Sequence, residues 1–228
     1  MKIWAHRGAS GEYPENTLLA FEHAIKQNAD GIELDVYQVE DEFYVWHDRV
    51  IPLFADTLIW QLTKHQVQQV QLHHKQHIPT LAEALQAIAG RVEVNIELKR
   101  IADVTALVQV IEQAVRQTTP AESLLISSFN HHYLAQLAQS GSNWRLGLLT
   151  ASSPLDMAFT CNAMAVYSIH FDVNCLRPED IELAHRLGLK VYVYTVDRQS
   201  ELQWLKDWGV DGVFSNFPAN ARAFIEQL

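Results

Sequence analysis

The chain has 228 residues, of which 48% are hydrophobic and 19% charged, a balance typical of a globular protein and not of a disordered chain. Its 17 Lys and Arg residues against 27 Asp and Glu leave a net charge of −10, which argues against binding to nucleic acid or to an anionic membrane surface. The sequence shows neither a bilayer-spanning apolar run nor a signal-peptide core, so the expected location is the cytoplasm. Cys161 and Cys175 lack metal-site spacing and are expected to be reduced thiols.

The first part of the chain alternates short β-rich runs with amphipathic helical patterns. A strand is expected over Lys2–His6, followed by a helix over 16–28 with Asn16 or Thr17 as its N-cap. The runs 31–38 and 42–48 are expected to form two strands joined by a tight polar turn. A helix over 81–90, ended by Gly90, and a strand over 92–99 follow.

The same alternation continues to the end of the chain. The remaining strands are expected at 123–129, 145–150, 165–171, 190–196 and 212–215, and the remaining helices at 104–117, 133–140, 155–163, 178–187, 201–208 and 219–227. If the 42–48 run extends the second unit, eight strands alternate with helices, which favours a single (β/α)8 TIM barrel over an open doubly wound sheet. No linker rich in Gly, Ser or Pro divides the sequence, so residues 1–228 are expected to form one domain.

Residues 49–79 depart from this alternation and are expected to form an irregular excursion. The stretch Gln61–His77 within it is rich in glutamine and histidine, which is typical of a solvated helix or loop between β/α units. Its histidines lack a carboxylate or thiolate at ligand spacing, so a transition-metal site is not expected there.

Carboxylates concentrate at the expected carboxyl ends of strands, where the reacting groups of a TIM barrel lie. Glu33 and Asp35 are two residues apart in one strand, so both side chains point to the same face. Glu97 and Lys99 repeat this spacing in the strand 92–99. Three carboxylates on one site require a cation, and oxygen ligands favour Mg²⁺ or Ca²⁺ over Zn²⁺. Glu33, Asp35 and Glu97 are therefore the predicted ligands of one divalent cation.

The charges of these strand ends indicate a phosphate substrate. Three carboxylates and a dication sum to −1, and adding Arg7 and Lys99 gives +1, which a singly charged phosphodiester would neutralise. His6 and His47 each end a strand-like run. Two histidines beside a metal can supply the general base and the general acid that displacement at phosphorus requires.

Several short motifs, taken in order, resemble those of the glycerophosphodiester phosphodiesterase family. The motifs are His6-Arg7-Gly8, Pro14-Glu15-Asn16-Thr17, Gly31-Ile32-Glu33-Leu34-Asp35-Val36, His47-Asp48, Ile78-Pro79-Thr80-Leu81, Glu93-Val94-Asn95-Ile96-Glu97-Leu98-Lys99 and Leu125-Ile126-Ser127-Ser128-Phe129. The resemblance implies a TIM barrel, one bound Mg²⁺ or Ca²⁺, and a small-molecule glycerophosphodiester substrate. The implied reaction hydrolyses compounds such as glycerophosphocholine to sn-glycerol 3-phosphate and an alcohol.

The resemblance also implies a role for each matched site residue. These roles are metal ligation by Glu33, Asp35 and Glu97, phosphate binding by Arg7 and Lys99, and acid/base catalysis by His6 and His47. By similarity to the phosphoinositide phospholipases C, His6 is the expected base and His47 the expected acid. The nucleophile is either the glycerol 2-hydroxyl of the substrate, which would give a cyclic phosphate, or water.

Three segments depart from the family pattern. Arg49–Phe54 stands in place of a basic, Thr-rich stretch, Tyr194–Asp197 in place of a Trp-Thr-x-Asn pattern, and Ser215-Asn216 in place of Thr-Asp. Because these segments are expected at the pocket rim, they predict a preference for a small headgroup or an unusual diester. The alternatives are a phosphodiesterase for a different diester and a catalytically silent phosphate-binding barrel, since a fold alone does not establish a reaction. A metal-assisted lyase or aldolase fits the two histidines less well.

Overall fold

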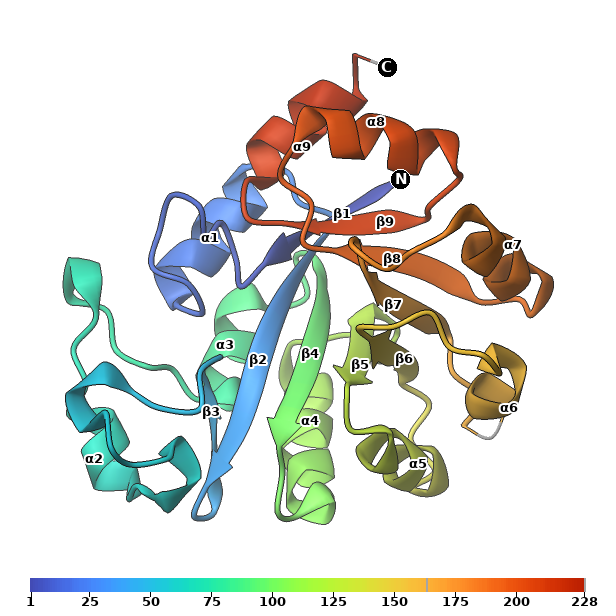
Figure 1. The fold of residues 1–228 in the computed structure, drawn as a ribbon. Coiled ribbons are helices and arrows are strands. Elements are labelled where there is room, and N and C mark those ends of the chain that lie inside the picture. Colours follow the sequence, from blue (N-terminus) through green and yellow to red (C-terminus); the bar gives the residue numbers. More distant parts are fainter. Residues whose placement is uncertain (163, 228) are drawn as a thin grey trace.

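The computed structural model describes residues 1–162 and 164–227. Eight parallel strands close into a barrel, and helices cover its outer surface (Figure 1). β1 (Lys2–His6) pairs in parallel with both β2 (Gly31–Val39) and β9 (Gly212–Ser215), which closes the barrel. The expected (β/α)8 TIM barrel is therefore confirmed, and the open doubly wound sheet is excluded.

The other strands and helices alternate along the chain. The strands are β3 (Glu42–Val45), β4 (Glu93–Arg100), β5 (Leu124–Ser128), β6 (Arg145–Thr150), β7 (Ser168–Asp172) and β8 (Lys190–Tyr194). The helices are α1 (Leu18–Lys26), α2 (Lys64–Gln68), α3 (Leu81–Ile88), α4 (Val104–Gln117), α5 (His131–Gln139), α6 (Met157–Asn162), α7 (Pro178–Arg186), α8 (Gln199–Asp207) and α9 (Pro218–Ile225). None of these helices in the described residues is long and apolar enough to cross a membrane.

A few element boundaries differ from the sequence-based expectation. β3 ends at Val45, three residues before the expected end. The last backbone hydrogen bond to β2 runs from the Trp46 N–H to the Asp35 carbonyl at 3.0 Å, and beyond it the chain turns away from β2. β7 begins at Ser168 and not at Ala165, because Ala165 has a φ of 48° that interrupts extended backbone. The expected helix end at Ala163 lies outside the described residues.

Apolar side chains fill two separate regions of the barrel. The outward faces of the strands pack against the helices, as Ile3, Leu34 and Val213 do. The inward faces contribute a smaller cluster in which the Trp4 ring lies 5.6 Å from Tyr192 and 6.0 Å from Phe214. Because side chains alternate along a strand, His6 points into the same interior as Trp4. The aromatic cluster thus forms a solid floor beneath the carboxyl ends of the strands.

The excursion, residues 49–79, lies beside β3 and outside the barrel (Figure 1). It contains α2 and three short 3₁₀ turns at 52–54, 59–61 and 73–75. Its histidines are exposed, as expected of a solvated segment. However, its apolar residues form a core of their own with the β2–β3 hairpin, consisting of Tyr37, Val39, Tyr44, Ile51, Ile59, Leu62, Val67, Val70 and Ile78. The excursion is therefore held against the hairpin by buried apolar side chains and is not simply solvated. Its high glutamine content did not indicate this core.

Candidate active site

The first βα loop carries the chain from His6 to α1. Gly8 has a φ of 81°, and a Cβ there would lie 2.7 Å from the Ala20 backbone, so the loop is packed tightly against the helix. Thr17 is the N-cap, since its side chain accepts a hydrogen bond from the Ala20 N–H. Asn16 is thereby free for another role, and its Nδ2 donates to Asp35 Oδ2 at 2.9 Å. Of the two expected N-cap candidates, Thr17 is therefore the cap, whereas Asn16 contacts the carboxylate of Asp35.

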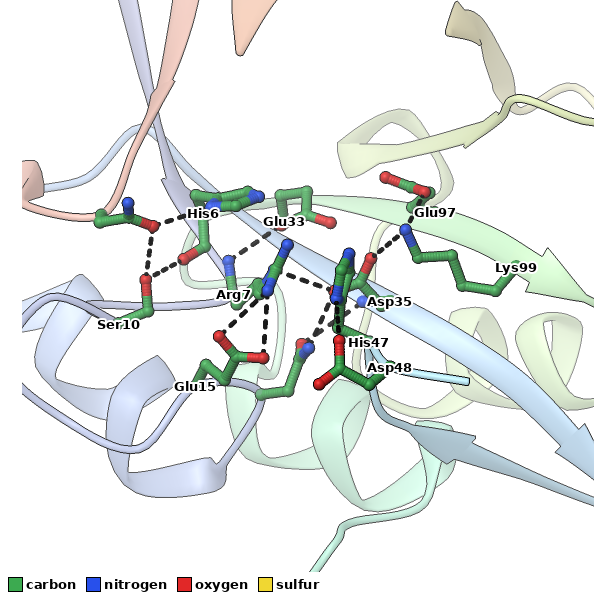
Figure 2. Close-up of polar contacts among 12 residues, drawn as sticks. His6, Arg7, Ser10, Glu15, Glu33, Asp35, His47, Asp48, Glu97 and Lys99 are labelled. Carbon is green, nitrogen blue, oxygen red and sulfur yellow. Dashed lines mark hydrogen bonds and ion pairs between the residues drawn. The ribbon is translucent and has the colours of Figure 1, made fainter. Parts of the chain in front are cut away.

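Three buried carboxylates converge at the carboxyl end of the barrel (Figure 2). Glu33 and Asp35 come from β2 and Glu97 from β4, where Asp35 and Glu97 are direct partners in the strand register. One oxygen from each residue lies within 4.8 Å of the other two. Within the residues that the structure describes, this is the one such group of potential metal ligands. The three predicted ligands are therefore brought together.

The surroundings of two of these carboxylates raise their pKa. Burial, together with the negative charges of Asp35 and Glu97, raises the pKa of Glu33 well above its usual value. Burial and Asp35 also raise the pKa of Glu97 to about 7. Glu33 Oε2 accepts a hydrogen bond from the Arg7 N–H at 2.9 Å, but its buried Oε1 has no hydrogen-bond partner among the described residues. An unpartnered oxygen in a cluster of like charges is well suited to a cation.

Two cations hold Asp35. Lys99 Nζ lies 3.0 Å from Asp35 Oδ1, and Arg7 Nε lies 3.3 Å from Oδ2. Burial by itself would raise the pKa of Asp35. The charges of Lys99 and Arg7 lower this pKa by more than burial raises it, so the net shift is downward. Lys99 also pairs with Glu97, and an Arg7 Nη1 lies 3.0 Å from a Glu15 carboxylate oxygen. Glu15 adds a negative charge that the sequence-based charge sum did not include.

His6 is oriented by a chain of hydrogen bonds. Its Nδ1 lies 2.8 Å from Asn216 Oδ1, and Asn216 Nδ2 donates to Asp197 Oδ2 at 2.7 Å. The Asp197 carboxylate can only accept, so the amide oxygen faces His6 and requires a proton on Nδ1. Nε2 is then the basic nitrogen. Burial, with a smaller contribution from Arg7, lowers the pKa of His6 to about 4, so the ring is neutral at pH 7.

His47 reaches the site through the β2–β3 hairpin. β3 runs antiparallel to β2 from Val39 and Glu42 back to Val36 and Val45, which returns the chain to the level of Asp35. His47 follows directly, and its Nδ1 lies 2.8 Å from Asp48 Oδ1. Asp48 is therefore an orienting partner for the ring. Figure 2 shows His47 near Asp35 and on the far side of Arg7 from His6.

A small cavity of about 30 Å³ lies beside the carboxylates. Its lining includes His6, Glu33, Glu97 and Tyr194. The Tyr194 hydroxyl donates to the Thr150 carbonyl at 2.9 Å, and its ring meets Phe129 edge to face at 5.9 Å. Phe129 is 47% exposed at the rim, so its ring is open to a ligand on one face.

Comparison with known proteins identifies the family. The sequence profile of the glycerophosphoryl diester phosphodiesterase family matches residues 6–220. The chain belongs to this family. It is 31% identical to a glycerophosphodiester phosphodiesterase of Caldanaerobacter subterraneus subsp. tengcongensis, over 95% of this chain and 94% of that protein. It is 29% identical to a glycerophosphodiester phosphodiesterase of Bacillus altitudinis, over 100% and 99% of the two chains. The protein is therefore a phosphoric diester hydrolase of this family.

Solved structures of the family share the fold. A phosphodiesterase of Oleispira antarctica, in complex with the product sn-glycerol 3-phosphate, superposes with a TM-score of 0.91 at 24% identity, covering 99% of this chain and 97% of that one. A glycerophosphodiester phosphodiesterase of Agrobacterium tumefaciens superposes with a TM-score of 0.80 at 24% identity, covering 98% and 99%. Both confirm the barrel architecture.

All seven site residues named from the sequence lie at this end of the barrel. Three residues were not named as site residues from the sequence. Glu15 binds Arg7, Asn216 binds His6, and Asp197 accepts hydrogen bonds from Asn216. Asn216 follows β9 directly, and Asp197 lies three residues after β8. The strand-end rule that selected the other residues would have included both.

Proposed function

We propose that the enzyme hydrolyses glycerophosphodiesters to sn-glycerol 3-phosphate and an alcohol, with one divalent cation held by Glu33, Asp35 and Glu97. The observation that carries the proposal is the convergence of three buried carboxylates with an unpartnered Glu33 oxygen, in a chain of this family. The bound product of the Oleispira antarctica phosphodiesterase supports the same substrate class.

The donor set fits a hard cation. It consists of carboxylate oxygens with no nitrogen or sulfur, which suits Mg²⁺ or Ca²⁺ better than Zn²⁺. When bound, the cation would polarise a phosphoryl oxygen and offset charge that develops on it. Binding would also lower the pKa of Glu33 and Glu97, because it replaces their mutual repulsion with attraction.

Arg7 and Lys99 would bind the phosphate. Both side chains are largely buried and lie against Asp35, so their charges are held at the cavity and are little screened by solvent. Arg7 is further positioned by Glu15 on its outer side. A guanidinium and an ammonium on one anion would orient the phosphorus relative to the two histidines.

His6 and His47 would perform the proton transfers. His6 is neutral with Nε2 free, so it would act as the base that accepts the proton of the attacking hydroxyl. His47, with Nδ1 at Asp48, would present Nε2 to the leaving oxygen and donate a proton to it. Either water or the glycerol 2-hydroxyl fits the role of nucleophile, and a cyclic glycerophosphate detected during turnover would identify the second route.

The direct test measures glycerol 3-phosphate release from glycerophosphocholine and glycerophosphoethanolamine with Mg²⁺, with Ca²⁺ and with EDTA. We expect release that depends on added metal. The variants His6→Ala and His47→Ala should each lose about 10²-fold to 10⁴-fold in kcat, whereas His65→Ala, at an exposed position of the excursion, should retain full activity. Release that is unaffected by EDTA, or full activity in both histidine variants, would contradict the proposal. No release under any of these conditions would favour the silent phosphate-binding barrel.

A further inference from the structure

A large groove adjoins the candidate active site on one side. Its volume is about 800 Å³, and it lies between the first βα loop, Trp46 and the excursion. In Figure 1 this is the region where the excursion faces α1. The small cavity beside His6 is too small for more than a fraction of a diester, whereas this groove has room for a sizeable group.

The groove lies beside the groups that would bind phosphate. Glu15 lines the groove, and its carboxylate binds Arg7 at 3.0 Å (Figure 2). Trp46 also lines it, immediately before His47, and its backbone N–H donates to the Asp35 carbonyl at 3.0 Å. The groove therefore lies next to Arg7, through Glu15, and next to His47, through Trp46.

The position of the groove indicates which half of the substrate it would bind. If His47 protonates the leaving oxygen, then the alcohol that departs lies on the His47 side of the phosphorus. The groove opens on that side. The glycerol half, which remains attached to phosphate, would lie toward His6 and the cavity lined by Tyr194. The groove is thus placed to receive the leaving alcohol.

The lining of the groove is mostly apolar. It combines the apolar residues Pro14, Trp46, Ile51, Pro52, Leu53, Val70 and Leu72 with the polar residues Glu15, Gln69, Gln71 and His73. Leu53 is 64% exposed there, so its side chain is open to contact with a ligand. Among the described lining residues the one carboxylate is Glu15, and it is paired with Arg7. The groove therefore offers burial of apolar surface, and its described lining residues include no unpaired carboxylate for a cationic headgroup.

We propose that this groove binds an apolar alcohol moiety, so that the preferred substrates are glycerophosphodiesters of alkyl alcohols and not of choline or ethanolamine. The inference rests on the proposed function and specifies its substrate class. It also assigns a role to the segment Arg49–Phe54, whose departure from the family pattern places Ile51 and Leu53 in the groove.

The proposal can be tested by measuring kcat/KM for a series of n-alkyl esters of glycerol 3-phosphate, from ethyl to octyl. Each ester is used below the concentration at which it self-associates. We expect kcat/KM to rise about twofold per methylene, because an open groove removes only part of each methylene from water. Glycerophosphocholine should be hydrolysed more slowly than the hexyl ester. A flat series, or faster hydrolysis of glycerophosphocholine than of every alkyl ester, would overturn the proposal.

Two matched variants locate the effect. Leu53→Asn changes an exposed groove residue without adding a charge, and Leu155→Asn makes the same change at a fully exposed leucine in the β6–α6 connection. We expect Leu53→Asn to lower kcat/KM for the hexyl and octyl esters about fivefold while the ethyl ester is unaffected. Leu155→Asn should leave the whole series unchanged. Equal effects of Leu53→Asn on short and long esters would overturn the assignment of the groove.

The same assay separates this proposal from the function on which it rests. Release of glycerol 3-phosphate from the ethyl ester or from glycerophosphocholine, without a dependence on chain length, would reject the groove alone. No release from any ester with either metal would reject the proposed function and the groove proposal together.

Discussion

Asn216 is the residue that decides which nitrogen of His6 is basic. Its amide orientation is set by two bonds to Asp197, from Nδ2 at 2.7 Å and from the backbone N–H at 2.8 Å. Ser10 Oγ also donates to Asn216 Oδ1, at 2.8 Å. Of the candidate acid/base and metal-binding residues, Asn216 hydrogen-bonds His6, so it acts on the reaction by positioning the ring.

Removal of this contact should slow the chemical step more than it weakens binding. We expect Asn216→Ala to lower kcat by about tenfold to a hundredfold with KM changed less than threefold, because the ring loses its tautomer and its orientation. Steady-state kinetics give the two constants, and ¹⁵N shifts of the His6 ring report the tautomer directly. An unchanged tautomer, or a loss confined to KM, would contradict a positioning role; Asn143→Ala, at an exposed site, is the control.

A second buried histidine affects stability and not catalysis. His170 lies beneath the site, with Ser168 Oγ 2.8 Å from its Nε2 and the rings of Tyr192 and Phe214 each 5.3 Å away. Burial lowers the pKa of His170 to about 3. The unfolded chain takes up this proton near pH 6.5, while the folded chain does not until about pH 3. The free energy of unfolding must therefore fall as the pH drops below 6.5, and His6 contributes in the same direction.

The variant His170→Gln should retain more of its stability in acid. Between pH 7 and pH 4.5 the wild-type chain should lose about 2–3 kcal/mol more of its unfolding free energy than the variant does. Urea unfolding at the two pH values measures both differences. The exposed-site variant His74→Gln is the control and should follow the wild type. Equal acid losses in all three proteins would mean that His170 is already protonated in the fold.

At the scale of elements, the β1–α1 connection sets the position of Arg7. The loop passes so close to α1 that a Cβ on Gly8 would lie 2.7 Å from the Ala20 carbonyl carbon, and Gly8 also has a left-handed φ of 81°. By contrast, Gly188 at the end of α7 has a φ of 77°, but a Cβ there would meet nothing within 4 Å.

These two glycines separate backbone strain from steric overlap. We expect Gly188→Ala to lower the unfolding free energy by about 1 kcal/mol, through its positive φ alone. Gly8→Ala should lower it by about 2–4 kcal/mol, because the loop must also move away from α1. That movement carries the Arg7 N–H away from Glu33, so activity should fall as well. Urea midpoints and kcat/KM provide the comparison, and similar losses in both variants would argue that the loop adjusts freely.

At the scale of the whole molecule, the cluster of Glu33, Asp35 and Glu97 is a destabilising feature that a cation would relieve. The chain carries a net charge of −10, and these three carboxylates place negative charge in the barrel interior. A ligand that binds only the folded state stabilises it according to its concentration. At one hundred times its dissociation constant, Mg²⁺ or Ca²⁺ should add about 2.7 kcal/mol.

Thermal unfolding measures this linkage without any substrate. We expect the Tm to rise by about 5–10 °C on addition of the metal and to return with EDTA. Glu33→Gln removes one charge and one ligand, so it should raise the Tm in EDTA and abolish most of the metal-dependent increase. A metal response of the same size in Glu33→Gln would show that the ion binds elsewhere. Glu122→Gln, at a surface position in the 3₁₀ turn 121–123, is the matched control.

The sequence alone predicted most of the elements and the candidate site residues. Periodicity depends on local side-chain order, so strands such as Lys2–His6 and Arg145–Thr150 could be placed without any knowledge of their neighbours. The spacing of Glu33 and Asp35 placed both on one face for the same reason. Family motifs then linked these residues to His47 and Glu97, which lie far apart along the chain.

Only the tertiary structure decided how these parts meet. Closure of the barrel rests on the pairing of β1 with β9, which are about two hundred residues apart, and no local pattern encodes that contact. The same holds for Asn216 at His6, for Glu15 at Arg7 and for the groove between the first loop and the excursion. Charge partners, buried oxygens and grooves arise where separate strand ends and loops converge in space. Their identity therefore depends on packing, which the order of residues along one strand does not reveal.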